Sequence, residues 1–118
     1  MLHPISISDL KFNPFDLIGK DWYLVTSGTP DNYNTMTASW GTMGIFWGKP
    51  VVNTFIRPQR YTHEFIEKTD LYTISFFHED MRPALQLCGS KSGRDIDKAA
   101  ATGLKPMAVE GTTTFEQA

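Results

Sequence analysis

Two arginines and a threonine near the middle of the chain are the residues best suited to hold a ligand. Arg57 and Arg60 flank a Pro-Gln pair at the predicted end of a strand, and Thr62 stands at the predicted start of a helix. Guanidinium groups bind phosphate in a planar, bidentate way, and free N–H groups at a helix N-terminus attract anions. Two surface arginines are the simpler interpretation of the pair alone. Because strand end, arginines, hydroxyl and helix start fall within six residues, the stretch favours a phosphate site.

A run of small residues precedes this stretch. Thr37-Ala38-Ser39 would let a flat ligand approach the backbone, and Thr35, Thr37 and Ser39 share one face of a strand because they recur at spacing two. Their hydroxyls could hydrogen-bond the carbonyls and ring nitrogens of a heterocycle. A solvated strand face is the commoner alternative. Together with a phosphate site, the run indicates a phosphorylated aromatic ligand.

A third candidate is the polar loop from Gly89 to Asp95, which two glycines bound. It lacks the Gly-Lys-Ser/Thr order of a phosphate-binding Walker motif. A plain connection between two helices is one interpretation, and a loop that closes over a cofactor is the other.

Catalysis by the chain's own side chains is not indicated. The three histidines and Cys88 lack the spacing of metal ligands, so we expect no metal site, and no serine sits in a Gly-x-Ser-x-Gly elbow. No pair of carboxylates suggests acid–base work. Cys88 is better interpreted as a small buried helix residue than as a nucleophile. If the chain is an enzyme, a cofactor carries the chemistry.

The composition describes one globular domain over residues 1–118. Hydrophobic residues make up 41% and aromatic residues 13%, which excludes disorder. The net charge of −2 argues against nucleic acid as the main partner. No apolar run has the length of a membrane span, and no secretory signal is visible. One cysteine and no signal predict a cytoplasmic protein.

The predicted elements are strands with short helices inserted between them, which suggests a mostly antiparallel β-barrel. Helices are predicted from Thr62 as N-cap to Lys68, from an Asp80 cap to a stop at Gly89, and over Ile96–Thr102 with Asp95 as cap and Gly103 as stop. Gly41 and Gly44 are interpreted as bends or a bulge. The predicted strands are Trp22–Ser27, Asn34–Trp40, Val51–Arg57, Leu71–Phe77 and Met107–Val109.

Several motifs, in one order from about Pro14 to the end, resemble the flavin reductase-like, FMN-binding split-barrel proteins. That family includes flavoredoxin-like and NADH:FMN oxidoreductase-like members. The resemblance implies a split barrel that dimerises and binds FMN near the dimer interface. The family domain continues past the part matched here, so the closing strands of the barrel look absent or are supplied by a partner chain. The motifs are Asn13-Pro14-Phe15, Gly19-Lys20-Asp21-Trp22, NTMTASWG, Lys49-Pro50, FIRPQRYT, Phe65-Ile66-Glu67-Lys68, Ser75-Phe76-Phe77 and CGSKSGRD.

The resemblance also implies roles for particular residues. Met36 to Ser39 would line the flavin ring, and the loop from Cys88 to Arg94 would approach it from the side. The implied activity is hydride transfer from NADH or NADPH to the flavin, with no catalytic side chain, and with a small molecule or protein as electron acceptor. A non-enzymatic FMN-binding module for electron transfer or flavin storage is the alternative. The implied cofactor contacts are Met36, Thr37, Ala38, Ser39, Arg57, Arg60, Tyr61, Thr62, Cys88, Gly89, Ser90, Ser92 and Arg94.

Overall fold

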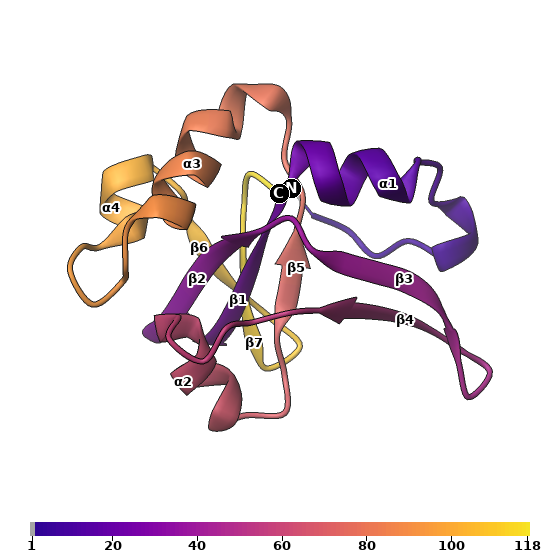
Figure 1. The fold of residues 1–118 in the computed structure, drawn as a ribbon, viewed down its shortest axis with the longest axis horizontal. Helices are drawn as coiled ribbons and strands as arrows, with labels where there is room; N and C mark the ends of the chain where they lie inside the picture. Colours follow the sequence, from indigo (N-terminus) through magenta and orange to yellow (C-terminus); the bar gives the residue numbers. More distant parts are fainter. Residues whose placement is uncertain (1) are drawn as a thin grey trace.

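The computed structural model describes residues 2–118 as a strand-rich fold decorated with short helices (Figure 1). A central antiparallel sheet has the strand order β2-β1-β5, and two separate hairpins, β3-β4 and β6-β7, complete the strands. The strands are β1 (Tyr23–Thr29), β2 (Asn32–Ala38), β3 (Gly41–Phe46), β4 (Lys49–Thr54), β5 (Thr73–Ser75), β6 (Pro106–Val109) and β7 (Thr112–Phe115). The helical segments are η1 (Ile7–Asp9), α1 (Pro14–Asp16), η2 (Leu17–Asp21), α2 (Tyr61–Glu67), η3 (Glu79–Met81), α3 (Arg82–Ser90) and α4 (Lys98–Thr102).

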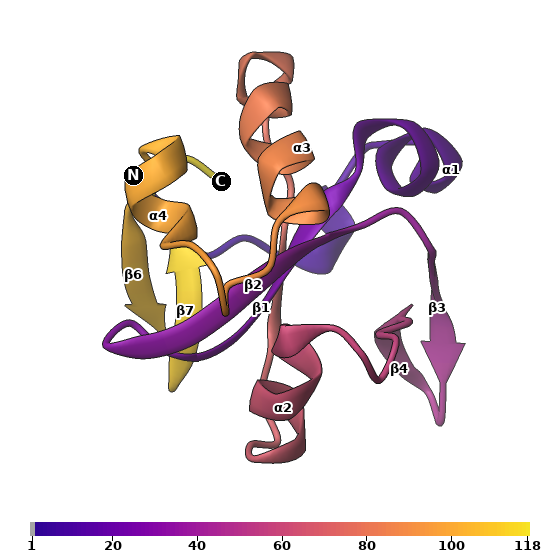
Figure 2. The same cartoon turned by 60° about the vertical axis from the view of Figure 1, so that its left-hand side comes forward.

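Strand β1 is the centre of the molecule because it is buried on both faces. Leu24 points to a core that includes Leu85 of α3 and Phe115 of β7, whereas its neighbours Tyr23 and Val25 point to a second core. The alternation follows from the two-residue period of a strand. Figure 2 shows α2 and α3 on opposite sides of the strands β1 and β2. The two cores hold β2 and the start of α2 in fixed positions.

Buried hydroxyls join β7 to the central sheet. The Thr113 hydroxyl donates to the Gly28 carbonyl at 2.8 Å, and the Thr73 hydroxyl of β5 donates to the Thr113 carbonyl at 2.6 Å. Ser75 and Thr114 share a hydrogen bond of 2.8 Å between their hydroxyls. The β6-β7 hairpin therefore packs across the sheet through side-chain hydrogen bonds and is not an added strand of it.

The hairpin of β3 and β4 extends away from the central sheet (Figures 1 and 2). Its register pairs Phe46 with Lys49, so Trp47 and Gly48 form a two-residue turn, and both have positive φ, 53° and 71°. Two-residue hairpin loops need this conformation, which glycine adopts freely and tryptophan adopts at a cost. Ile45, Phe46 and Trp47 are exposed at the tip.

The predicted strand-rich class is confirmed, but among residues 2–118 the strands form three sheets and no closed barrel. Two strands were missed. Residues 41–46 form β3 and not the predicted bends, because Gly41 and Gly44 lie in a hairpin whose partner strand supplies the hydrogen bonds. Strand β7 was missed because its run of threonines has little apolar character, although all four residues are buried.

The predicted helices exist with shifted ends. Helix α2 begins one residue before Thr62, with Arg60 as N-cap, so the predicted Thr62 cap is wrong. Helix α3 continues through Gly89 and lacks an Asp80 cap. Asp97, not Asp95, caps α4 by accepting a hydrogen bond from the Ala100 N–H, and Gly103 ends it with φ 78°, as predicted. No helix in the described part of the chain is long and apolar enough to span a membrane.

Candidate functional site

Most of the predicted site residues line two adjoining cavities that share Met36 and Arg60. The first has a volume of about 250 Å³ and lies beside the end of β2 and the segment after β4. The second, about 270 Å³, lies between the start of α2 and the loop that joins α3 to α4. We call the two together the groove. Met36, Thr37, Ala38, Ser39, Trp40, Phe55, Arg57 and Arg60 line the first cavity; Asn34, Met36, residues 59–62, residues 89–94 and Lys98 line the second.

One end of the groove lies along the end of β2, at Met36–Ser39. Met36 and Ala38 are buried against the second core, so the strand is held firmly under the cavity. Ser39 is half-buried and Trp40 is exposed at the cavity wall. The small side chains at positions 37–39 line this cavity.

The hydroxyls of the stripe predicted on β2 form hydrogen bonds within the protein. The Thr35 hydroxyl is fully buried, donates to the Val25 carbonyl at 3.2 Å and shares a hydrogen bond of 2.8 Å with the Thr26 hydroxyl. The Thr37 hydroxyl donates to the Leu85 carbonyl of α3. Both hydroxyls therefore fasten β2 to its neighbours, and the hypothesis that they hydrogen-bond a heterocycle is wrong for this arrangement.

Arg57 and Arg60 both line the first cavity, and Arg60 also lines the second. The Arg57 guanidinium carbon lies 5.1 Å from the centroid of the Trp40 ring, which holds the side chain beside the groove. Arg60 is half-buried at the N-cap of α2, and burial, followed by the nearby charge of Arg57, lowers its pKa. Within residues 2–118 neither arginine forms an ion pair with a carboxylate. Two adjacent cations without a counter-charge are the donor set for an anion.

Thr62 and Asn34 form the buried floor of the second cavity. The Thr62 hydroxyl accepts a hydrogen bond from the Asn34 side-chain amide at 2.7 Å, and both residues are buried. Gly93 of the loop packs directly against Asn34, because a Cβ at Gly93 would overlap the Asn34 side-chain oxygen. This contact fixes how closely the loop approaches α2.

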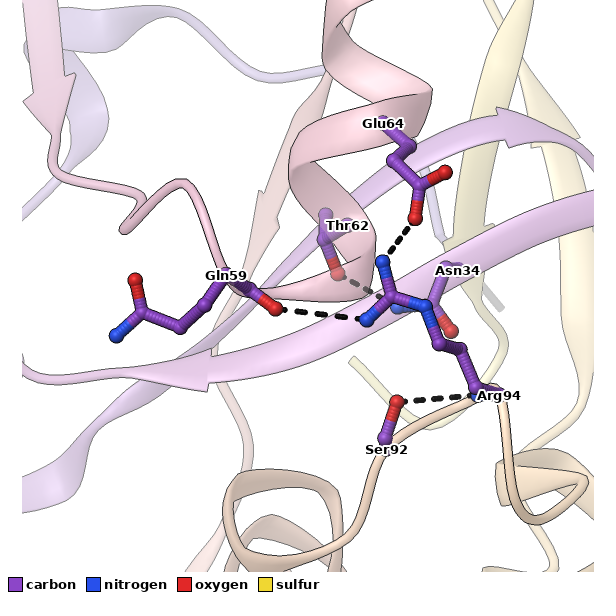
Figure 3. Close-up of polar contacts among 6 residues, drawn as sticks. All are labelled: Asn34, Gln59, Thr62, Glu64, Ser92 and Arg94. Atoms are coloured by element: carbon purple, nitrogen blue, oxygen red, sulfur yellow. Dashed lines mark hydrogen bonds and ion pairs between the residues drawn. The ribbon is translucent and has the colours of Figure 1, made fainter.

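Arg94 ties the loop to α2 and to the segment just before it, as Figure 3 shows. Its guanidinium pairs with the Glu64 carboxylate, donates to the Gln59 carbonyl at 3.4 Å and lies 4.7 Å from the centroid of the Tyr61 ring. The Ser92 hydroxyl accepts a hydrogen bond from the Arg94 backbone N–H at 3.1 Å. The loop therefore lines the second cavity, and the Arg94 charge is already paired.

Cys88 is placed differently from the other loop residues. Its side chain is fully buried in the first core, where it packs with Leu24 and Leu85. Burial raises the pKa of its thiol, and the nearby Lys98 opposes that effect. The thiol is therefore neutral and out of reach of a ligand in the groove. The interpretation of Cys88 as a buried helix residue is confirmed, and Cys88 does not line either cavity of the groove.

Lys98 is the most buried charged residue of the groove. Only 6% of it is exposed, and its Nζ donates to the Thr35 carbonyl at 2.6 Å and to the Cys88 carbonyl at 2.9 Å. Burial lowers its pKa to about 8, an effect that Cys88 opposes and Arg60 reinforces. No acidic side chain in the described part of the chain pairs with it.

The low pKa of Lys98 predicts that the free energy of unfolding depends on pH. In the unfolded chain the pKa of a lysine is about 10.4. Between about pH 8 and pH 10 the unfolded state therefore binds more protons than the folded state. The contribution of Lys98 to the free energy of unfolding therefore rises with pH in this window. At pH values below the window, this contribution is at its most unfavourable. Urea denaturation of the wild type and of Lys98→Met from pH 7 to pH 9.5 measures the difference, which should shift steadily in favour of the wild type. A difference independent of pH would contradict the buried, depressed lysine.

Comparison with known proteins identifies the family. A model of the flavin reductase like domain matches residues 15–118. This chain belongs to that family. The match confirms the resemblance of its motifs and covers every residue that lines the groove.

Relatives of this flavin reductase-like chain agree on the fold. An uncharacterized protein of Pyrococcus abyssi (strain GE5 / Orsay) is 35% identical over 71 residues, which make up 60% of this chain and 41% of that protein. Flavoredoxin of Desulfovibrio vulgaris (Miyazaki F) has a TM-score of 0.73 at 25% identity over 81% of this chain and 54% of its own. An FMN-binding protein from Thermus thermophilus, solved with bound 1-cyclohex-2-enone, has a TM-score of 0.73 at 22% identity over 99% of this chain and 64% of its own. This chain spans less than two thirds of the length of each.

Seven residues that line the groove of this flavin reductase-like chain were not among the predicted contacts: Asn34, Trp40, Phe55, Gln59, Lys91, Gly93 and Lys98. Asn34 and Gly93 are in contact although they lie far apart in the chain, so no local pattern could reveal them. Gln59 lies between the two predicted arginines and contributes its backbone carbonyl. Lys98 looks like an ordinary solvated lysine beside two alanines, and only the packing of α4 against α3 and β2 buries it.

Proposed function

We propose that this chain binds FMN in the groove, with the phosphate held by Arg57 and Arg60 and the ring lying along Met36–Ser39. The observation that carries the proposal is the group of cations at one end of the groove, which lacks a carboxylate counter-charge within residues 2–118. A phosphate monoester supplies the missing negative charge in a form that guanidinium forks bind well. The name of the Thermus thermophilus neighbour, an FMN-binding protein, supports the same ligand.

The donor set fits FMN from end to end. The backbone N–H groups of Tyr61 and Thr62 lie in the first turn of α2, where hydrogen-bond donors are free for an anion. The loop residues Gly89, Ser90 and Ser92 line the same cavity and could contact the ribityl chain with hydroxyl and backbone groups. The paired Arg94 closes the groove on the side of α2 and limits access of water.

The proposed reaction is hydride transfer from NADH or NADPH to the flavin. The bound flavin supplies the electron-accepting ring, and the protein binds it, orients it and restricts water. The groove needs no general acid or base, because hydride transfer between two bound rings requires their positioning. This fits the first cavity, which no aspartate, glutamate, histidine or cysteine of the described residues lines.

A flavin-binding electron-transfer module is the second candidate. The likeness to flavoredoxin, a redox protein by name, at 25% identity supports it. The same phosphate contacts would serve this module, which would lack a productive surface for a nicotinamide. The two candidates therefore differ in turnover and not in FMN binding.

One experiment tests both candidates. Protein stripped of ligand is titrated with FMN, and binding is followed by the quenching of flavin fluorescence. NADH or NADPH is then added without oxygen, and loss of the visible flavin absorbance reports hydride transfer. Binding with bleaching supports the reductase, and binding without bleaching supports the electron-transfer module. A protein that takes up no flavin at saturating FMN would overturn the proposed function.

We also propose that two copies associate through the β3-β4 hairpin and complete a split barrel. Trp47 is 88% exposed and Phe46 65% exposed, and the two rings stack with centroids 6.0 Å apart. At the base of the hairpin, a cavity of about 640 Å³ is walled by Phe15, Ile18 and Trp40 among others. We expect the exposed apolar tip of one copy to pack into the apolar cavity of the other copy. The cavity shares Ser39, Trp40 and Phe55 with the groove, so a second copy seated there would lie beside the flavin.

Trp47→Asn is expected to weaken self-association without harming the hairpin. Asn-Gly is a preferred pair for a two-residue turn with positive φ, so the backbone of the variant is less strained than that of the wild type. Sedimentation velocity over a range of protein concentrations measures the effect, and Ile5→Asn, at another exposed apolar position, is the control. Equal association of Trp47→Asn and the wild type would remove the hairpin from the interface.

A further inference from the structure

One buried tyrosine joins the two chain segments at the base of the β3-β4 hairpin. Tyr23 is the first residue of β1 and is only 1% exposed. Its hydroxyl donates a hydrogen bond to the Trp40 carbonyl at 2.7 Å and shares another of 2.7 Å with the Thr54 hydroxyl. Because the phenol has a single hydrogen, which the Trp40 carbonyl accepts, the Thr54 hydroxyl donates in the second bond. One oxygen atom therefore links the residue before β3 to the last residue of β4.

The backbone of the hairpin packs closely around this hydroxyl. Gly41 pairs with Thr54 at the base of the hairpin, and a Cβ at Gly41 would lie 2.7 Å from the Tyr23 hydroxyl oxygen and 2.9 Å from the Asn53 carbonyl oxygen. The phenol ring packs against Phe76 with ring centroids 5.4 Å apart. Burial raises the pKa of the phenol, an effect that the bond from Thr54 opposes. The hydroxyl is therefore held in place and keeps the proton that it donates.

Trp40 connects this restraint to the anion site. Residue 40 lies between β2 and β3, outside both strands, and its side chain is 60% exposed. The Arg57 guanidinium carbon lies 5.1 Å from the centroid of the Trp40 ring, and both residues line the first cavity. An exposed arginine samples many rotamers, and a contact with an aromatic ring removes part of that freedom before a ligand binds. The ring restrains Arg57 only while its own backbone is held, and the Tyr23 hydroxyl holds it.

We propose that Tyr23 is a positioning residue of the groove: its hydroxyl fixes Trp40, and the Trp40 ring directs the Arg57 guanidinium toward the phosphate of the ligand. This inference rests on the proposed function for the identity of the ligand. Tyr23 lines neither cavity of the groove, so it acts through Trp40 and not by contact with the ligand. The backbone pairing of Tyr23 with Ala38 does not involve the hydroxyl, so the strand end under the flavin ring stays in place without it. The hydroxyl therefore contributes to the preference for a phosphorylated flavin and not to the affinity for the ring.

Tyr23→Phe tests this role because it removes the hydroxyl and keeps the ring contact with Phe76, so the variant should fold. Its affinity for FMN should fall about tenfold, whereas its affinity for riboflavin, which lacks the phosphate, should change less than about twofold. Thr54→Val removes one of the two hydrogen bonds and should cause a smaller loss of FMN affinity with no loss of riboflavin affinity. Fluorescence titration at a temperature where each variant is folded measures both affinities.

A double-mutant cycle separates positioning from a general loosening of the fold. In an Arg57→Ala background no guanidinium remains to be directed, so Tyr23→Phe should change the FMN affinity less than about twofold there. Tyr72→Phe is the matched control, because its hydroxyl donates to the Val52 carbonyl of the same hairpin at 3.3 Å and does not touch Trp40. This control should keep the wild-type ratio of the two flavin affinities. Equal losses of FMN and riboflavin affinity in Tyr23→Phe, or the same loss of FMN affinity with and without Arg57, would overturn the positioning role.

Inorganic phosphate distinguishes a failure of this inference from a failure of the proposed function. Phosphate should raise the melting temperature of the wild type and of Tyr72→Phe, and it should raise that of Tyr23→Phe less. If FMN does not bind but phosphate gives this difference, the positioning role stands and the flavin function fails. If FMN binds and Tyr23→Phe keeps the wild-type preference for FMN over riboflavin, the positioning role is overturned and the function stands. If neither FMN nor phosphate binds the wild type, both are overturned.

Discussion

Replacement of both Arg57 and Arg60 by alanine is expected to weaken FMN binding by roughly two to four orders of magnitude, since one charge-assisted hydrogen bond from each guanidinium contributes about 1.5–3 kcal/mol. The affinity for riboflavin should stay near its wild-type value because the ring contacts along Met36–Ser39 are unchanged. Neither arginine is paired with a carboxylate in the described part of the chain, so the substitution leaves no buried acid without a partner. The fold should therefore survive. Fluorescence titration with both flavins measures the two affinities.

Two controls sharpen this experiment. Arg57→Lys/Arg60→Lys keeps both charges and removes the forked geometry, so it should recover only part of the lost affinity. Lys11→Ala/Lys105→Ala removes two exposed charges elsewhere and should have little effect, because exposed charges are screened by salt. An equal loss of FMN and riboflavin affinity in the arginine variant would point to damage of the whole groove and contradict a phosphate site.

Gly93→Ala is expected to lower FMN affinity at least tenfold and to reduce the free energy of unfolding by about 1–3 kcal/mol, the usual cost of forcing extra volume into a packed site. The added Cβ would overlap the Asn34 side-chain oxygen and lie 3.2 Å from the Tyr61 ring. Because Asn34 is held by its hydrogen bond to Thr62, the loop must move outward. Movement of the loop takes its serines away from the cavity.

A double-mutant cycle checks this cause. In an Asn34→Ala background the obstacle is gone, so Gly93→Ala should cost much less there than in the wild type. Gly19→Ala is the control, because a Cβ at Gly19 meets nothing within 4 Å. Urea denaturation and FMN titration of the four proteins give the coupling. Equal costs of Gly93→Ala in both backgrounds would show that the overlap with Asn34 is not what matters.

Local patterns in the sequence predicted that Arg57, Arg60 and Thr62 lie close together, but they did not place Lys98 beside them. Arg57, Arg60 and Thr62 are neighbours in the chain, so a strand end followed by a helix start brings them together whatever the rest of the fold does. Lys98 reaches the same cavity from 36 residues beyond Thr62, through the packing of α4 on α3 and β2. Such long-range placement leaves no periodic signal.

The same distinction explains the errors in the fold. Strand β1 and the stop of α4 at Gly103 follow from local chemistry and were predicted within a few residues. The threonines of β7 are buried only because β1 and β5 supply partners for their hydroxyls, and a polar run gives no hint of this. The sequence left the hydroxyls of Thr35 and Thr37 open between a ligand contact and a solvated strand face, because their acceptors in β1 and α3 are invisible in the sequence.

The central claim is that the groove recognises FMN through its phosphate. The ratio of the dissociation constants of riboflavin and FMN for the wild-type protein at pH 7 tests it most directly, by fluorescence titration of protein stripped of ligand. Arg57 and Arg60 both line the first cavity and predict that FMN binds at least about 100-fold more tightly than riboflavin, since one charge-assisted hydrogen bond from each contributes about 1.5–3 kcal/mol. Equal affinities for the two flavins would contradict the claim.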